Sequence, residues 1–176
     1  SPKWVPQLGD AEQLAATMRA PDGVTFSALC PNAKGLERAL ATGLAEIAVF
    51  MSASETHNMK NINKTIDRTL GVFSEIIPPA LEAGVRVRGY LSTMWGCPYE
   101  GSVSADKSVG IARRLLDLGC YQVALSDTIG TGTPRQTQDI LRRSLDVMEL
   151  DQISMHMHDT RGTALANILV GLEMGV

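Results

Sequence analysis

The sequence predicts an α/β fold in which parallel strands alternate with helices, a partial (β/α)8 TIM barrel with about five complete βα units of eight. Three observations carry this prediction. Short apolar segments alternate with helical patterns along the whole chain, and polar residues follow the end of every predicted strand. No GxGxxG turn follows the first strand, although a doubly wound sheet would normally show one. Because no linker or low-complexity stretch interrupts the pattern, residues 1–176 are expected to form one domain.

Five segments have the composition of strands on a parallel sheet that is covered by helices. Each is short, nearly continuously apolar and rich in β-branched residues. Gly23, Gly84 and Gly119 stand just before three of these segments, where a helix would end and turn into a strand. The predicted strands are 24–30, 46–51, 85–91, 121–125 and 152–157.

Helical patterns fill the intervals between the predicted strands. In 104–118, leucine, isoleucine and valine recur at three- and four-residue intervals, and Pro134 suits the first turn of the helix that it opens. The pair Pro78 and Pro79 should kink or split the helix that contains it. The predicted helices are 11–19, 34–42, 62–83, 104–118, 134–148 and 161–174.

The carboxyl end of each predicted strand is polar. In parallel α/β folds these ends form one rim, and ligands bind there. Capping of the next helix would explain any single case, but five of five, with histidines and carboxylates among them, favours a shared site. The polar residues are Pro31 and Asn32, the run SASE at 52–55, Ser92 and Thr93, Ser126 to Thr128, and His158 to Thr160.

His156 and His158 form the strongest local signal for chemistry. Residues two apart in a strand face the same side, so both imidazoles should project inward while Met155 and Met157 face the covering helices. Such a pair near the rim predicts a two-point metal clamp, for which Mn, Fe, Co, Zn or Ni suits imidazole and Mg prefers oxygen ligands. Asp127, at the end of the preceding strand, could be a ligand, a partner that orients a histidine, or a substrate contact.

Other residues with chemical potential carry weaker signals. The loop at 130–134, GTGTP, could cradle an anion at a helix start, but a plain turn is an equal alternative. Cys97 lacks a visible base partner and is expected to be a packed thiol. His57 is expected in an exposed loop without a role, while Trp4 and Trp95 are expected to be packing anchors.

Composition excludes several function classes. The net charge is −3 and basic residues are scattered, so we expect no nucleic-acid partner. No apolar run approaches the roughly 20 residues that cross a bilayer, so we expect no membrane partner. The three cysteines, Cys30, Cys97 and Cys120, form no CxxC pair or disulfide framework, which favours a reducing compartment.

Several motifs occur in a recognisable order over essentially all 176 residues: SPKWVPQ at 1–7, KNIN at 60–63, RGY at 88–90, GCPYEG at 96–101, DTIGTGTP at 127–134 and HMHDT at 156–160. With them, the chain resembles the 3-hydroxy-3-methylglutaryl-CoA lyase family. The HxHDT element, with Ala166 and Asn167 downstream, is shared with isopropylmalate and homocitrate synthases and with the carboxyltransferase domain of pyruvate carboxylase. SPKWVPQ and GCPYEG are much narrower and resemble the lyases themselves.

The resemblance implies cleavage of 3-hydroxy-3-methylglutaryl-CoA to acetoacetate and acetyl-CoA, in leucine breakdown and ketone-body formation. It implies a divalent cation, Mg or Mn, and a CoA thioester as the small-molecule substrate. His156 and His158 match the family's metal ligands, and His156 is also a candidate for proton transfer. Asp127 matches an aspartate that is important for activity, while Thr128 and Tyr90 lie where the substrate should bind. The full-length protein is expected to be a homo-oligomer in the bacterial cytoplasm or the mitochondrial matrix.

The sequence departs from the family in what it lacks. The family's first strand carries an Arg-Asp pair, and a distal segment carries a metal-binding asparagine and a glycine-rich loop with a reactive cysteine. Neither is present. We therefore expect an interior fragment, truncated at both ends and covering about units three to seven of eight. Made alone, this stretch is expected to be poorly soluble, to bind metal weakly and to lack lyase activity.

Two alternatives stay open. A Claisen-type synthase of the same superfamily would share the metal and the histidines, although GCPYEG weighs against it. An inactive truncated barrel that serves as an interaction module would explain the missing strands. The intact His156, His158, Asp127 and Glu100 weigh against this second alternative.

Overall fold

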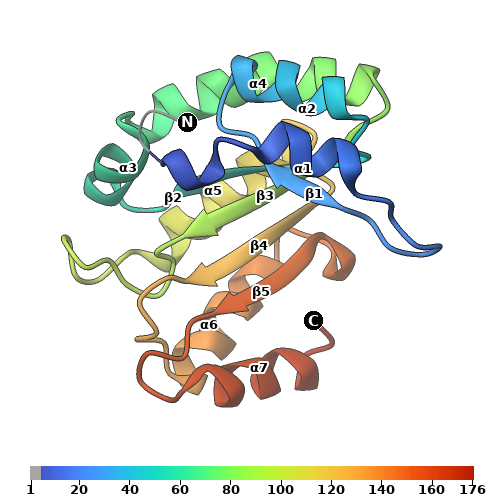
Figure 1. Ribbon diagram of the computed structural model, residues 1–176. Helices are drawn as coiled ribbons and strands as arrows, with labels where there is room; N and C mark the ends of the chain where they lie inside the picture. Colours follow the sequence, from blue (N-terminus) through green and yellow to red (C-terminus); the bar gives the residue numbers. More distant parts are fainter. Residues whose placement is uncertain (1–4) are drawn as a thin grey trace.

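A computed structural model describes residues 5–176, and its five strands form one parallel sheet in the order β1-β2-β3-β4-β5 (Figure 1). Ser1 to Trp4, including the predicted packing anchor Trp4, lie outside the described residues. The alternation of strand and helix that the sequence predicts is confirmed. The strands are β1 (Ser27–Leu29), β2 (Glu46–Ser52), β3 (Arg86–Ser92), β4 (Gln122–Asp127) and β5 (Ile153–Met157).

The helices lie on one face of the sheet and leave the other face largely uncovered (Figure 1). Of these, α3, α4, α5 and α7 contact the strands directly, α2 packs on α4, and α6 packs on α5 and α7. None of the helices in the described part of the chain is long and apolar enough to span a bilayer. The helices are α1 (Ala11–Thr17), α2 (Ala33–Thr42), α3 (Glu55–Ile62), α4 (Ile66–Glu82), α5 (Ala105–Asp117), α6 (Pro134–Leu145) and α7 (Ala164–Glu173), with 3-10 turns η1 (Pro6–Leu8) and η2 (Leu150–Gln152).

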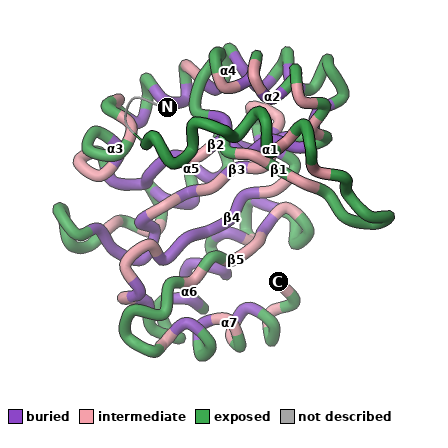
Figure 2. The backbone as a smooth tube through the Cα atoms, in the orientation of Figure 1, coloured by how far each residue is buried: buried purple, intermediate pink, exposed green. Residues whose placement is uncertain are grey.

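The core lies between the sheet and the helices, because alternate strand residues point to that side. Ile47, Val49 and Met51 of β2, in register with β3, contribute fully buried side chains to it. Figure 2 shows this burial concentrated along β2, β3 and β4 and on the inner sides of the helices. The opposite face, which we call the open face, carries the other alternate residues, including Arg88, Tyr90 and His156.

Strand β1 is shorter than predicted, with three residues in place of 24–30. It pairs only with β2, and only residues 27–29 find partners there. As an edge strand it has no second neighbour to extend the pairing, which explains why Val24 and the residues next to it remain irregular.

Helix α3 is an element that the sequence analysis placed in a loop. Ser54 caps it by accepting a hydrogen bond from the His57 backbone N–H at 3.1 Å, and Asn63 ends it in the left-handed region with φ 54°. Helix α4 starts at Ile66 and runs past Pro78 and Pro79 to Glu82 without splitting. The prolines and the residues four positions earlier lie on the exposed side, where water can satisfy the free carbonyls.

The glycine prediction is confirmed at the two turns that lead into β3 and β4. Gly84 has φ 76° and Gly119 has φ 111°, both in the region that side chains rarely adopt. At Gly119 an added Cβ would also lie 2.7 Å from Leu81 Cδ1, so both conformation and space require glycine there.

Candidate functional site

The two histidines project from the open face at the end of β5. Met155, the residue before His156, packs against α7, since its sulfur lies 2.3 Å from where a Cβ on Gly171 would be. Alternation therefore directs His156 and His158 to the other side. Their ring centroids are 5.1 Å apart with the planes tilted by 35°, and both residues are exposed. The rings are thus close enough to serve one ion.

Tyr90 lies beside the histidine pair. Its ring meets that of His156 edge-on, with centroids 6.2 Å apart and an interplanar angle of 84°. Arg88 lies two residues before Tyr90 in β3, and its guanidinium is 5.6 Å from the Tyr90 ring centroid. It donates hydrogen bonds to Ser154 Oγ at 3.0 Å and to Gln122 Oε1. These hydrogen bonds link β3, β4 and β5 next to the histidines. Tyr90 lies on the same open face as the two histidine rings.

Asp127 is fully buried, and its carboxylate is already occupied. One oxygen accepts a hydrogen bond from the Thr131 backbone N–H at 3.1 Å, and the other accepts from that of Gly132 at 2.7 Å. It is in register with Met157, on the helix-facing side of the sheet. Asp127 therefore anchors the loop at 128–133, and it does not lie beside the histidine rings on the open face.

The loop at 128–133 is built as a turn. Because the N–H groups of Thr131 and Gly132 donate to Asp127, they are not free to bind an anion, which favours the plain-turn alternative. Thr128 Oγ1 accepts a hydrogen bond from the Thr93 backbone N–H at 2.7 Å. Thr93 itself adopts a left-handed backbone conformation, with φ 64°. Thr128 thus joins the ends of β3 and β4, next to the predicted site.

The remaining candidates have structural environments. Cys97 is buried, 3.0 Å from Ser54 Oγ, and its sulfur accepts from the backbone N–H groups of Tyr99 and Glu100, as expected of a packed thiol. Trp95 is buried and donates from Nε1 to Thr137 Oγ1 at 3.0 Å, which agrees with a packing anchor.

The prediction that His57 occupies an exposed loop is wrong. It lies in α3, and its Nδ1 is 2.6 Å from the Oγ of Ser52. It is partly buried, because the helix lays it over the end of β2. Alternation within one strand cannot reveal such a contact, since the two residues belong to different elements.

Partial desolvation of its ring and the nearby His158 ring lower the pKa of His156 below its ordinary value. Its neutral form, which carries the lone pair that a metal needs, is therefore favoured near neutral pH. Within residues 5–176 no three His, Cys, Asp or Glu side chains are grouped so that they could hold a metal ion. The histidine pair accordingly offers two donors of a larger set.

Asn167 is a buried polar residue that the sequence marked only as part of a family motif. Asn167 of α7 is fully buried, and its Nδ2 donates to the Gly132 carbonyl at 2.9 Å. The signal that could have singled it out is its polarity within the otherwise apolar run ALANILVGL of α7.

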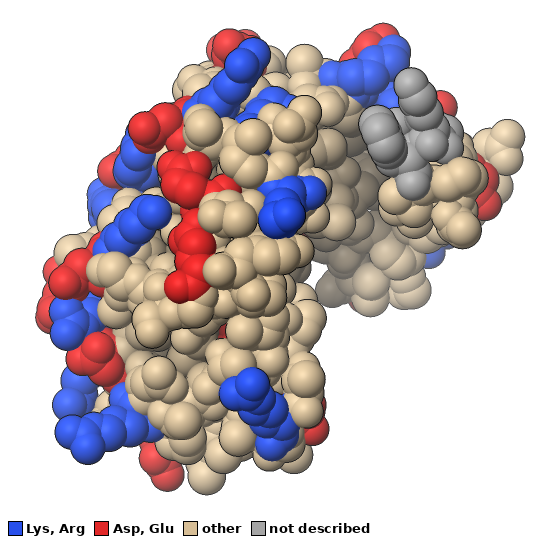
Figure 3. Space-filling model, turned by 90° about the vertical axis from the view of Figure 1, so that its left-hand side faces the viewer, with Lys and Arg blue, Asp and Glu red and all other residues tan. Residues whose placement is uncertain are grey.

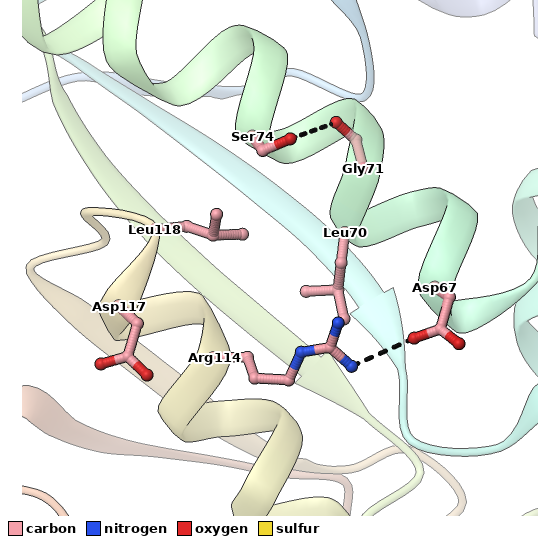
Figure 4. Close-up of a pocket in the computed structure, with 7 residues that line it drawn as sticks. All are labelled: Asp67, Leu70, Gly71, Ser74, Arg114, Asp117 and Leu118. Atoms are coloured by element: carbon pink, nitrogen blue, oxygen red, sulfur yellow. Dashed lines mark hydrogen bonds and ion pairs between the residues drawn. The ribbon is translucent and has the colours of Figure 1, made fainter.

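Figure 3 views the molecule toward the carboxyl ends of the strands and shows a hollow bordered mainly by uncharged residues, while Lys, Arg, Asp and Glu crowd the helical side. A separate groove of about 380 Å³ lies between α4 and α5, spanned by the ion pair between Arg114 and Asp67 at 3.1 Å (Figure 4). Leu70 and Leu118 line that groove, and none of the predicted site residues does.

A family model described as HMGL-like matches residues 4–176. The mitochondrial hydroxymethylglutaryl-CoA lyase of Bos taurus is 47% identical over 177 residues, covering 100% of this chain and 54% of that protein. A hydroxymethylglutaryl-CoA lyase of Bacillus subtilis (strain 168) is 45% identical, covering 99% of this chain and 58% of that protein. The chain thus spans somewhat more than half the length of these curated relatives.

Solved structures give the same result. The HMG-CoA lyase from Brucella melitensis superposes with a TM-score of 0.97 at 44% identity, covering 100% of this chain and 62% of that one. An HMG-CoA lyase from Acinetobacter baumannii, in complex with coenzyme A and 3-methylmalate, superposes with a TM-score of 0.94 at 32% identity, covering 100% of this chain and 57% of that one. These matches confirm the predicted partial barrel.

Proposed function

The chain belongs to the HMGL-like family, and from this membership we propose that its protein cleaves 3-hydroxy-3-methylglutaryl-CoA to acetoacetate and acetyl-CoA in leucine breakdown and ketone-body formation. Relatives at about 45% identity carry the name of this lyase. The observation that carries the proposal in this chain is the pair of imidazoles on the open face, His156 and His158, with ring centroids 5.1 Å apart.

The histidine pair fits a divalent cation. Both rings are exposed on one face, and the lowered pKa of His156 keeps its nitrogen available as a donor. When bound, the cation, which we propose to be Mg or Mn, supplies Lewis-acid polarisation of the substrate's oxygen atoms. His156 and His158 would hold it from β5, and further ligands would complete the set.

The chain's own residues would orient the substrate and move a proton. A base is proposed to take the proton of the C3 hydroxyl, after which the C2–C3 bond breaks and the enolate of acetyl-CoA is protonated, with His156 as a candidate for proton transfer. Tyr90, edge-on to His156, would contact the substrate, and Thr128 would do so from the end of β4. Asp127 is proposed to support activity by holding the loop at 128–133.

Relatives also guide the proposals on substrate class, location and assembly. A related lyase structure contains coenzyme A, which supports an acyl-CoA substrate. Relatives are described as mitochondrial or come from bacteria, which supports our proposal of the mitochondrial matrix or the bacterial cytoplasm. We further propose that the full-length protein is a homo-oligomer.

The test is to replace each site histidine separately in the protein as its gene encodes it. His156→Ala and His158→Ala should each weaken Mn²⁺ binding at least about tenfold, because each removes one donor of the set. Cleavage of 3-hydroxy-3-methylglutaryl-CoA should fall in parallel. His57→Gln is the matched control, since it changes the third histidine outside the proposed site and should leave both measurements unchanged. Unaltered Mn²⁺ affinity in both site variants would sink the metal assignment.

A further inference from the structure

Asn167 occupies an unusual environment for an amide side chain. It is fully buried in α7, and its Nδ2 donates one hydrogen bond, to the Gly132 carbonyl at 2.9 Å. Its Oδ1 has no hydrogen-bond partner among the described residues. A buried acceptor without a donor is destabilising, so an apolar side chain of similar shape would suit this position at least as well for packing alone.

The loop that Asn167 grips is held from its other side by Asp127, which accepts from the N–H of Gly132 at 2.7 Å. Gly132 has no room for a side chain: an added Cβ would lie 2.6 Å from Trp95 Cδ1 and 2.9 Å from Asp127 Oδ2. Its peptide groups are held by hydrogen bonds to β4 on one side and to α7 on the other. The hydrogen bond from Asn167 closes this arrangement.

The same loop lies directly against the segment that carries His158. A Cβ on Gly130 would lie 2.8 Å from the His158 carbonyl oxygen and 2.8 Å from the Thr160 nitrogen. The His158 N–H also donates to the Asp127 carbonyl at 3.2 Å. The His158 backbone is therefore contacted by the loop on one side and by the end of β4 on another.

We propose that Asn167 is a positioning residue that, through the Gly132 carbonyl, holds the loop at 128–133 against the His158 backbone and so sets the separation of His158 from His156. The inference rests on the proposed function, because that separation matters when both rings serve one ion. A two-donor site is sensitive to this spacing, since supporting groups outside the ligand set commonly change metal affinity by about 10- to 100-fold.

The experiment uses Asn167→Leu in the chain as its gene encodes it. Leucine keeps the volume and removes the hydrogen bond. We expect a melting temperature close to that of the wild type, because one unpaired buried acceptor, the Asn167 Oδ1, is exchanged for another, the Gly132 carbonyl. Co²⁺ affinity, read from the visible absorption of the bound ion, should fall about 10- to 100-fold, and hydrogen exchange at the His158 amide should accelerate.

Asn58→Leu is the matched control. Asn58 is equally buried, but its amide is fully used: it accepts from the Ser52 N–H at 2.9 Å and donates to the Lys64 carbonyl and to Thr69 Oγ1 at 2.8 Å each. Its replacement should lower the melting temperature more than that of Asn167 and leave Co²⁺ affinity unchanged. A purely structural role for Asn167 would instead give a lowered melting temperature and wild-type Co²⁺ affinity in Asn167→Leu.

The outcomes separate this inference from the proposed function. Wild-type Co²⁺ affinity and unchanged His158 exchange in Asn167→Leu would overturn it. If the wild-type protein itself binds no Co²⁺ through His156 and His158, the proposed function fails, and His158 exchange alone then decides whether Asn167 positions this residue. Should Asn167→Leu not fold, Asn167→Ser, which is too short to reach Gly132, gives the same measurements.

Discussion

Asp127 shows at the scale of one residue how a carboxylate at the end of a strand can act without facing the ligand. Both of its oxygens accept backbone hydrogen bonds, from Thr131 and Gly132, within a buried site. Each interaction involves a charged acceptor, and such hydrogen bonds are about twice as strong as neutral ones. The loop next to His158 therefore depends on this single side chain.

Replacing Asp127 by asparagine should destabilise the fold. The new NH2 group would face a backbone N–H, so one donor loses its acceptor at a cost of about 1–3 kcal/mol. Urea unfolding of the wild type and Asp127→Asn measures the difference in free energy of unfolding. Asp106→Asn, an exposed carboxylate paired with Arg143, is the control and should change the stability by less than about 1 kcal/mol. Equal stability of Asp127→Asn and the wild type would contradict the anchoring role.

His57 should make stability depend on pH. Burial lowers its pKa below the ordinary value of 6.5. The folded state therefore binds fewer protons than the unfolded state near pH 6, and stability falls as the pH drops below about 6.5. Above that pH, His57 is neutral in both states and no longer lowers the stability.

The measurement compares urea midpoints of the wild type and His57→Gln between about pH 5 and pH 7.5, the range in which histidine titrates. The wild type should lose more stability on acidification than the variant, which lacks the titrating ring. His156 is present in both proteins, so its own contribution cancels. Parallel curves for the two proteins would show that His57 titrates equally in both states.

How much of the site could be predicted depended on whether its geometry is local. The common side of His156 and His158 follows from strand alternation alone, and the structure has both rings on the open face. The loop contacts of Asp127 and the contact between His57 and Ser52 could not be predicted, because they join residues across turns whose path no periodicity encodes. Asn167 was visible only as a motif member for the same reason.

Among the elements, β2, β3 and β4 share a charged cluster near their amino ends. Glu46 is buried, accepts from Arg86 Nη2 at 2.8 Å and accepts from the Tyr121 hydroxyl at 2.9 Å. Arg86 in turn lies 4.8 Å from the Tyr121 ring centroid. One carboxylate therefore links side chains from β2, from β3 and from the residue that precedes β4.

Glu46→Gln should weaken the attachment of these strands. A neutral amide oxygen accepts hydrogen bonds from Arg86 and Tyr121 less strongly than a carboxylate does. We expect the free energy of unfolding to fall by about 1–2 kcal/mol, a figure kept low because Arg86 is partly exposed. Thermal unfolding of Glu46→Gln beside Glu37→Gln measures this loss. Glu37 pairs with Lys34 on an exposed helix surface, so its replacement should leave stability close to that of the wild type. Similar losses in the two variants would contradict the role of the cluster.

Element type was more predictable than element ends. All five strands and the six predicted helices exist, because apolar periodicity follows directly from which side of each element is covered. Helix α3 was missed because it carries only one buried residue, Asn58, and so has no apolar stripe to detect. The extent of β1 was overestimated because pairing depends on a partner strand, which an isolated segment does not reveal.

At the scale of the whole molecule, the described chain exposes apolar surface beside its last strand. Leu165, Leu169 and Leu172 of α7 are 79%, 54% and 64% exposed and recur at helical spacing. Strands β1 and β5 each have one neighbour, so both sheet edges are unpaired within the described residues. Exposed apolar stripes and unpaired edges both promote association.

We therefore predict that residues 1–176 expressed alone are poorly soluble, bind Mn²⁺ weakly and do not cleave 3-hydroxy-3-methylglutaryl-CoA. Replacing Leu165, Leu169 and Leu172 by glutamate should raise the soluble fraction, since these side chains are mostly exposed, but should restore neither metal affinity nor cleavage. Sedimentation of the lysate, Mn²⁺ titration and a cleavage assay are the measurements. Tight Mn²⁺ binding with turnover by the 176 residues would refute the prediction.

The sheet order follows the chain order, so every strand pairs with the strand made immediately before or after it. Each pairing closes one strand–helix–strand unit, as when Ser27 meets Glu46 and Glu46 meets Arg86, so no strand has to find its partner in a distant unit of the chain. During synthesis on the ribosome, β2 and β3 can pair once β3 has emerged behind α4, and each later unit can add to an edge that already exists. Nascent chains halted after Asp127 should therefore already protect the β2–β3 amides from exchange.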